Sequence, residues 1–348
     1  MRSDIQTLGA FEELGNQLRE FCEKWKAGKA GEHPGFHETL ALAKGANPWF
    51  TEGNILHALQ RWGEALTGEN LRGWLSPYKL EQPRQPKTVG IVMAGNVPLV
   101  GFHDFLCVLL SGHRVLAKLS SQDRYLMPFL SQLLIGAQPQ LAGRIRFVEG
   151  KMEGFDAVIA TGSNNTGRYF EYYFGKGPHI IRKNRNSAAI LNGRESPADL
   201  AALGEDIFRY FGLGCRNVSK VYVPKGYDFD SFFKAIFCFG DVVDHYKYAN
   251  NYDYNRAIFL MNTQQFLDNG FLLLREEASF SSPISVLHYS HYDSMETLRK
   301  GLKASEDQLQ CIVSNLGIPG DVPFGGTQDP AMGDYADGVD TLEFLLGL

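Results

Sequence analysis

The stretch TVGIVMAGNVPLVGFHDFLCVLLSGHRVLAKLSS, residues 88–121, decides the fold of this chain. The β-branched apolar run TVGIVMAG ends in glycine, an apolar segment of helical length follows from Leu99 to Leu110, and HRVLAKLS predicts a second strand. A strand, a helix and a strand in this order form a right-handed βαβ unit with parallel strands. The stretch therefore predicts an α/β protein built on a parallel sheet.

The same alternation continues along the rest of the chain. Further strands are predicted at RIRFVEG, FDAVIATGS, HIIRKN and AAILN, and further helices at QDRYLMPFLSQLLIGA and RYFEYYF. After about residue 188 the pattern continues less regularly, with strands at SKVYVP, AIFLMN, SVLHY and LQCIVSN and helices at 198–211, 228–239 and 293–304. Two doubly wound, Rossmann-like α/β lobes follow from this pattern.

The N-terminal part predicts helices instead. Phe11, Leu14, Leu18 and Phe21 share one helical face, and Thr51 precedes a second periodic segment. Two prolines in EQPRQPK then mark the break before the first strand. We therefore expect a helical segment ahead of the two lobes.

Composition and charge exclude several functions. The chain has 348 residues and a net charge of −5 without a basic run, so nucleic acid is not an expected partner, because phosphate contacts need clustered Lys and Arg. The N-terminus does not resemble a signal peptide, and no stretch has the roughly 18 apolar residues of a membrane span. The five cysteines have no paired or metal-type spacing, which predicts no metal site and favours a reducing cytoplasm.

One cysteine lies in an unusual setting. In FGLGCRNVSKVYVP, residues 211–224, Cys215 follows two glycines in close succession and precedes a strand. A thiolate is a strong nucleophile near neutral pH and carries thioesters, whereas most free cysteines are small buried apolar residues. That second interpretation is assigned to the cysteines within apolar helix or strand patterns, which are Cys22, Cys107, Cys238 and Cys311.

Three glycine-containing turns are weaker candidates when each is taken alone. TGSNNTGR, residues 161–168, follows a strand and places free backbone N–H groups at a helix N-terminus, which attracts phosphate, but it also fits a plain turn and cap. MAGNVPL, residues 93–99, puts Asn96 at the carboxyl end of a strand, where its amide could donate to an oxyanion. VPFGG, residues 322–326, indicates only a loop.

Taken in order, these motifs resemble the aldehyde dehydrogenase superfamily. MAGNVPL, KLSS, TGSNNTG, the Gly-x-Cys stretch, REEASF and PFGG follow one another as in that superfamily, over residues 88–348. IVMAGNVPLVGFHDFLCVLLSG and DYADGVDTLEFL are similar to its acyl-CoA reductase branch, the family of the long-chain fatty acyl reductase of bacterial luminescence. The resemblance implies an aldehyde dehydrogenase-like fold and reduction of an acyl thioester, such as a fatty acyl group, to an aldehyde.

The resemblance also implies roles for individual residues. Cys215 matches the superfamily's nucleophile, Asn96 matches the asparagine that forms an oxyanion hole with the backbone N–H of Cys215, and Phe324 matches an aromatic residue near the thiol. The residues that match cofactor-binding positions are Lys118 at the adenosine ribose, Gly162, Ser163 and Gly167 in the phosphate turn, and Glu277 at the nicotinamide ribose.

Two departures from the superfamily refine this prediction. Hydrolytic members place a glutamate base about 34 residues before the nucleophile, where HIIRKNRNS has Ile181 and Arg182 instead. A missing base disfavours hydrolysis but leaves thioester reduction intact; His179 in the same segment is a candidate proton donor, and a structural role fits it equally well. Ser121 stands where NAD-preferring members carry glutamate, which favours NADPH over NADH, with NADH as the alternative.

The domain prediction follows from the strand and helix pattern together with this resemblance. It comprises a cofactor-binding domain over 1–187 (helical segment 1–85, Rossmann-like sheet 87–187), a catalytic domain over 188–322 carrying Cys215, and a C-terminal segment over 323–348. The expected partner is acyl-CoA or an acyl-carrying protein as donor, and a homo-oligomer stays open. The alternatives are a CoA-acylating dehydrogenase of short aldehydes, a cysteine acyltransferase without redox activity, and a non-catalytic binding protein.

Overall fold

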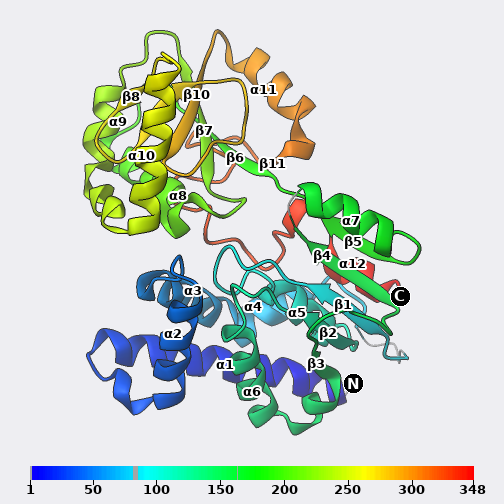
Figure 1. Cartoon of the computed structure of the whole chain (residues 1–348). Helices are drawn as coiled ribbons and strands as arrows, with labels where there is room; N and C mark the ends of the chain where they lie inside the picture. The colour runs from blue at the N-terminus through cyan, green and yellow to red at the C-terminus, as the bar shows by residue number, and fades with distance from the viewer. Residues whose placement is uncertain (1, 81–84, 163) are drawn as a thin grey trace. The chain divides into compact units, whose positions relative to one another are not determined.

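The structure is a computed structural model that describes residues 2–80, 85–162 and 164–348 (Figure 1). The chain forms two compact units. The first unit comprises Met1–Lys183 together with Ala331–Leu348, and the second comprises Asn184–Pro330. Each unit contains one sheet covered by helices, so the predicted α/β fold with two Rossmann-like sheets is confirmed.

The sheet of the first unit has five parallel strands in the order β3-β2-β1-β4-β5. The central strand β1 buries Val89, Gly90 and Ile91 in succession, as strands covered on both faces do. This double coverage explains why β1, β2 and β4 were predictable as apolar runs, whereas the edge strands β3 and β5 bury fewer residues. Their bounds are β1 Thr88–Val92, β2 Arg114–Lys118, β3 Ile145–Phe147, β4 Ala157–Thr161 and β5 His179–Arg182.

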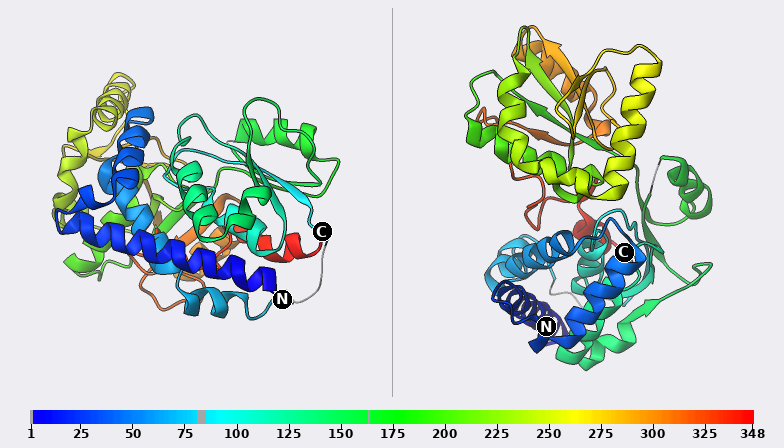
Figure 2. Two further views of the ribbon diagram at one scale, coloured as in Figure 1. Left: turned by 90° about the horizontal axis from the view of Figure 1, so that it is seen from below. Right: turned by 60° about the vertical axis from the view of Figure 1, so that its left-hand side comes forward.

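The helices of the first unit include the predicted N-terminal segment. Phe11, Leu14, Leu18 and Phe21 are all fully buried on α1, which packs against α3, α4, α5 and α6 (Figure 2). Thr51 caps α3 by accepting a hydrogen bond from the Asn54 N–H. The bounds are α1 Arg2–Lys26, η1 Ala30–Glu32, α2 Pro34–Ala46, α3 Glu52–Ala65, α4 Gly68–Leu75, α5 Phe102–Leu110, α6 Leu126–Ala137, η2 Pro139–Arg144, α7 Asn164–Phe174, η6 Ala336–Gly338 and α12 Thr341–Leu346.

The C-terminal segment returns to the first unit. The His103 imidazole donates to the Met332 carbonyl at 2.9 Å, and the Tyr78 hydroxyl donates to the Asp340 carboxylate at 2.6 Å. The helix α12 packs against α5, whose residues are buried at every position except His103. Residues 331–348 therefore complete the core of the first unit.

The second unit has a six-stranded sheet in the order β11-β6-β7-β10-β9-β8, parallel except for β8. Its first strand begins at Asn186, so the chain passes between the units at residues 183–184. The strands are β6 Asn186–Ile190, β7 Val218–Pro224, β8 Leu267–Asp268, β9 Leu273–Glu276, β10 Val286–Tyr292 and β11 Leu309–Val313. The helices are α8 Pro197–Phe208, η3 Arg209–Gly212, α9 Phe229–Ala235, η4 Ile236–Asp244, α10 Tyr246–Met261, α11 Met295–Ala304 and η5 Glu306–Gln308.

Two local predictions were wrong. The segment AIFLMN was expected to be a strand but forms the end of α10, where Tyr248, Tyr252, Asn255 and Phe259 are buried at helical spacing. The helix expected from Leu99 begins at Phe102, because Leu99 adopts a φ of +58° that no right-handed helix accommodates.

Candidate active site

The backbone around Cys215 is fixed by buried side chains of the second unit. Cys215 is partly exposed and lies between η3 and the amino end of β7. The Ser187 hydroxyl, fully buried, donates to the Cys215 carbonyl at 3.0 Å. The Asn217 side chain accepts from the Gly214 N–H at 2.8 Å and donates to the Arg209 carbonyl at 2.8 Å. The peptide groups on both sides of the partly exposed Cys215 are thus held in place.

The chain enters this loop through a strained turn. Tyr210 and Phe211 have φ values of +54° and +57°, and Gly212 follows at +74°. For residues other than glycine, the left-handed region costs roughly 1–2 kcal/mol each. Such strain persists where the surroundings over-determine the backbone, and it clusters at functional sites. Here the Asn217 bond to the Arg209 carbonyl and the burial of Tyr210 hold the turn.

A second network ties the Phe324 turn to the Cys215 loop. Asp206, fully buried on α8, accepts from the Gly325 N–H at 2.7 Å and from the Thr327 N–H and hydroxyl at 2.9 and 2.8 Å. The Arg216 side chain donates to the Thr327 carbonyl at 2.5 Å. Gly325 has a φ of +82°, so the turn requires glycine there. The turn that carries the buried Phe324 is therefore fixed relative to the loop that carries Cys215.

Asp206, Asn217, Thr327 and Ser187 were not identified from the sequence. A signal was available for Asp206, because it lies beside Leu203 and Ile207 on the buried face of α8, where a carboxylate needs partners. Asn217 stands two residues after the candidate nucleophile, but its three hydrogen bonds depend on where α8 ends. These residues position the loop and the turn.

Glu277 lies just past β9 in the second unit. Its carboxylate accepts from the Ala278 N–H at 2.9 Å and pairs with Arg275 at 3.1 Å. The Ala278 N–H, with the Arg275 charge, lowers the pKa of Glu277 below its usual range. The carboxylate is therefore ionised. Glu277 is also partly exposed.

In the first unit, Asn96 lies in the turn between β1 and α5. The buried carboxylate of Asp123 accepts from the Leu99 N–H at 3.0 Å, and the Asn47 amide donates to the Gly95 carbonyl at 3.3 Å. A Cβ on Gly95 would come within 2.5 Å of the Ser120 Oγ, so the turn packs against the β2–α6 loop too closely for any other residue. Asn96 is partly exposed on this fixed turn.

The sheet order brings three predicted groups to one edge. In the register of the parallel strands, Val92 of β1 is paired with Lys118 of β2 and with Ala160 of β4. Asn96 and Gly162 follow Val92 and Ala160 by four and two residues, so the Asn96 turn, Lys118 and Gly162 lie at adjacent carboxyl ends. Ser121, exposed, follows Lys118, and Gly167 is buried on α7. Ser163 lies outside the residues that the structure describes.

The structure does not bring His179 to that edge. His179 is exposed at the amino end of β5, in register with Val158 near the start of β4, and its Nδ1 donates to the Gly177 carbonyl at 2.8 Å. Arg182, in the segment that lacks the glutamate base, is buried and forms an ion pair with Asp104 and a 2.8 Å hydrogen bond to Thr341. Arg182 therefore joins β5 to α5 and the C-terminal segment.

The other cysteines differ from Cys215 in environment. Cys22, Cys107 and Cys311 are buried as predicted, and burial raises the pKa of Cys22 to about 11 and that of Cys107 well above its usual range. The prediction was wrong for Cys238, which is exposed, because the segment after Ile236 is a 3₁₀ helix with only Ile236 buried.

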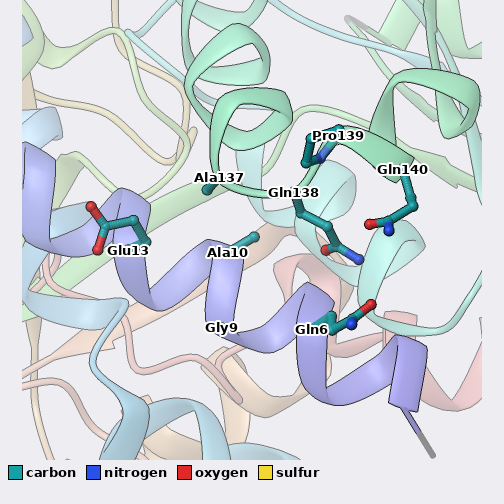
Figure 3. Close-up of a pocket in the computed structure, with 8 residues that line it drawn as sticks. All are labelled: Gln6, Gly9, Ala10, Glu13, Ala137, Gln138, Pro139 and Gln140. Atoms are coloured by element: carbon teal, nitrogen blue, oxygen red, sulfur yellow. The ribbon is translucent and has the colours of Figure 1, made fainter.

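Two further features bear on what the site can hold. Among the described residues, no group of three side chains is arranged to bind a metal ion, and no helix is long and apolar enough to cross a bilayer. Figure 3 shows a pocket between α1 and the α6–η2 connection of the first unit. None of the predicted site residues lines it; the lining residues are Gln6, Gly9, Ala10, Glu13, Ala137, Gln138, Pro139 and Gln140.

Solved structures with a similar fold are aldehyde dehydrogenases. Aldehyde dehydrogenase 21 of Physcomitrella patens, solved with succinate, aligns with a TM-score of 0.66 at 13% identity, covering 99% of this chain and 84% of its own. The Mycobacterium tuberculosis aldehyde dehydrogenase solved with NAD⁺ aligns with a TM-score of 0.60 at 15% identity, covering 88% and 76%. These likenesses define the class: the chain has the aldehyde dehydrogenase fold.

The sequence places the chain more narrowly. The model of the family described as acyl-CoA reductase (LuxC) matches residues 8–231, about two thirds of the chain, and no curated protein sequence matches. The chain belongs to the acyl-CoA reductase (LuxC) family, and the resemblance noted in the sequence is confirmed. It is therefore an oxidoreductase that acts on acyl or aldehyde groups.

Proposed function

We propose that this protein reduces an acyl thioester to an aldehyde with NADPH, through an acyl group carried on Cys215. The observation that carries the proposal is the Cys215 loop itself. Cys215 is a partly exposed residue on a backbone that is fixed by Ser187 and Asn217 and tied to the Phe324 turn through Thr327. Preorganised backbone amides of this kind stabilise an oxyanion at little cost in reorganisation.

In the proposed reaction the Cys215 thiolate attacks the carbonyl carbon of the acyl donor. The resemblance assigns stabilisation of the tetrahedral oxyanion to the Cys215 N–H and to Asn96. Collapse expels the donor thiolate, which takes up a proton, and leaves the acyl group as a thioester on Cys215. A bound reduced nicotinamide would supply the hydride that reduces this thioester at its carbonyl carbon. The second oxyanion then collapses, releasing the aldehyde and regenerating the Cys215 thiolate.

The carboxyl edge of the first sheet supports binding of the cofactor there. Lys118, the Asn96 turn and Gly162 are adjacent on this edge, which is where open α/β sheets bind ligands. The Lys118 ammonium group and the backbone N–H groups at Gly162 are hydrogen-bond donors that suit a dinucleotide. Ser121, which is exposed three residues after Lys118, would not repel a 2′-phosphate, whereas a carboxylate at this position would. We accordingly assign the adenosine and diphosphate part of the cofactor to the first unit. The nucleophile belongs to the second unit, as does Glu277, which the resemblance assigns to the nicotinamide ribose.

The absence of a hydrolytic base supports reduction over oxidation to a free acid. Arg182 is buried and paired with Asp104 and Thr341, so that part of β5 offers no carboxylate to activate water. General-base activation is typically worth 10²–10⁴-fold, so without it the acyl group on Cys215 persists long enough to be reduced.

The test incubates the protein with NADPH or NADH and a series of acyl-CoA and acyl-carrier-protein donors, following loss of reduced nicotinamide and formation of aldehyde. We expect NADPH-dependent aldehyde formation and acyl labelling of the wild-type protein. Both should be lost in Cys215→Ala, while the exposed-site control Cys238→Ala should retain them. Reduction that persists in Cys215→Ala would refute the proposal.

A further inference from the structure

The segment that carries Glu277 is held to the sheet of the second unit by side chains. After β9 ends at Glu276, residues 277–280 have no regular secondary structure, yet each of their four carbonyls accepts a hydrogen bond from a side chain of β7 or β10. The bonds run from Lys220 to Glu277 and Ala278 at 2.6 and 2.7 Å, from His288 to Ser279 at 3.0 Å, from Ser219 to Phe280 at 2.8 Å, and from Ser290 to Glu277 at 3.2 Å.

The arrangement of the donors follows from the sheet geometry. Lys220 and His288 are register partners on adjacent strands, and Ser290 shares a face of β10 with His288 because side chains alternate along a strand. Ser219 is the extra residue where the pairing of β6 and β7 shifts register, and a bulge re-aims its side chain. The four donors therefore converge on one short segment.

Of the four donor side chains, Lys220 has the largest free-energy cost of burial. It is 1% exposed, and its ammonium group donates to two carbonyls; among the described residues no carboxylate forms an ion pair with it. Burial lowers the pKa of Lys220 to about 8 and also lowers that of His288, so His288 is neutral and its Nδ1 carries the proton donated to Ser279. Burying an ammonium group costs free energy unless hydrogen bonds and a counter-charge compensate it.

We propose that Lys220 is a positioning residue that sets Glu277 for the cofactor ribose. This inference rests on the proposed function, in which Glu277 binds the nicotinamide half of NADPH. The Glu277 carboxylate is itself oriented by the Ala278 N–H and by Arg275, so its direction depends on the peptide groups that Lys220 holds. The hydrogen bonds by which Ser187, Asn217 and Arg216 fix the Cys215 loop come from other side chains than Lys220.

The two half-reactions separate this role from a purely structural one. Acylation of Cys215 needs no cofactor, whereas reduction does. Lys220→Met keeps the length and apolar stem but removes both donors, leaving the Glu277 carbonyl with one donor and the Ala278 carbonyl without one. We expect the KM and Kd for NADPH to rise about 10- to 100-fold, the equivalent of one or two lost buried hydrogen bonds, while the acylation rate stays within about twofold.

The matched control is Lys225→Met. Lys225 follows β7 on the surface, where it pairs with an equally exposed Asp293, and its loss should change neither half-reaction. Ser290→Ala, which removes one weaker donor to the Glu277 carbonyl, covers the case in which Lys220→Met does not fold and should raise the KM for NADPH a few-fold without slowing acylation.

Unchanged affinity for NADPH in the folded Lys220→Met protein, or acylation falling in parallel with reduction, would overturn the inference. If only Ser290→Ala folds, an unchanged KM for NADPH in that variant, or a parallel fall in acylation and reduction, would overturn it as well. Failure of the proposed function looks different, since the wild-type protein would then neither be acylated nor bind NADPH.

Discussion

Asp206 in the second unit and Asp123 in the first are both buried carboxylates that hold a turn with a candidate site residue, but they are satisfied differently. Asp206 accepts three hydrogen bonds, shared between its two oxygens. The Oδ2 atom of Asp123 accepts from the Leu99 N–H, and its Oδ1 forms no hydrogen bond within the described part of the chain. The Phe324 turn is therefore held by a saturated carboxylate, whereas the Asn96 turn depends on one that is only partly compensated.

The difference appears in how each carboxyl responds to burial. Burial raises the pKa of Asp123 from 3.8 to about 6, and the Leu99 and Leu126 N–H groups offset only part of this effect. Burial also raises the pKa of Asp206, but the amides of Thr327 and Gly325 and the Thr327 hydroxyl oppose the rise. The comparison implies that the first unit tolerates protonation of Asp123. In the second unit both oxygens of Asp206 are needed as hydrogen-bond acceptors.

The largest effect is expected for Asp206→Ala. The change leaves two backbone amides and the Thr327 hydroxyl without their buried acceptor, which should lower the free energy of unfolding by about 3–5 kcal/mol. Because Thr327 also binds Arg216, acylation of Cys215 should slow as well. Urea unfolding and acyl labelling measure the two effects.

Glu205→Ala is the control for Asp206→Ala on the same helix. Glu205 pairs with Arg209 one turn away and is partly exposed, a kind of pair worth about 0.3–0.5 kcal/mol. If the two variants lost similar stability, the contrast between a saturated and a surface carboxylate would disappear.

The second largest effect is expected for Asn217→Ala. Asn217 forms three buried hydrogen bonds, to Gly214, Asp206 and Arg209, so its truncation should cost about 2–4 kcal/mol and release the strained turn before Cys215. The acylation rate should fall more than the affinity for NADPH. Asn192→Ala, at an exposed position, is the control; equal losses in acylation and NADPH affinity would argue against a local role for Asn217.

The parts of the fold and of the candidate site that could be predicted from the sequence are those that a local sequence pattern determines. The inner strands β1, β2 and β4 of the first sheet were predictable because they are buried on both faces and appear as apolar runs, and Cys215 stood out beside its glycines. The AIFLMN segment of α10 is apolar enough to imitate a strand, and only its burial at helical spacing reveals the helix.

The networks could not be predicted because they join distant parts of the chain. Asp206 reaches Thr327 across 121 positions, and Asp123 reaches Leu99 across 24. Nothing in the local pattern around Lys220, a lysine within a strand, indicates that it is buried beneath the Glu277 segment. Such contacts follow from sheet order and register rather than from composition.

Asp123→Asn should show the opposite sign from Asp206→Ala. The folded protein holds the Asp123 proton more tightly than the unfolded chain, so the stability of the wild type falls as pH rises from about 4 to about 6 and stays lower above that. The full difference is at most about 3 kcal/mol. The asparagine oxygen can still accept from Leu99 but cannot ionise, so Asp123→Asn should gain stability relative to the wild type between pH 4.5 and pH 7.5.

Urea unfolding of both proteins at the two pH values measures this gain, with the exposed Asp307→Asn as control. A relative stability that does not change with pH would mean that Asp123 is as well compensated as Asp206, and the contrast between the two carboxylates would fail.

The smallest effect is expected for Ser187→Ala. Ser187 is fully buried and gives one hydrogen bond to the Cys215 carbonyl, and alanine fits the same space, so the loss should be about 1 kcal/mol, with Ser231→Ala at an exposed position as control. The Asn217 bonds still hold the other side of the loop, so acylation should slow only a few-fold. A much larger loss of acylation with little loss of stability would assign the orientation of the Cys215 peptide mainly to the single hydrogen bond from Ser187.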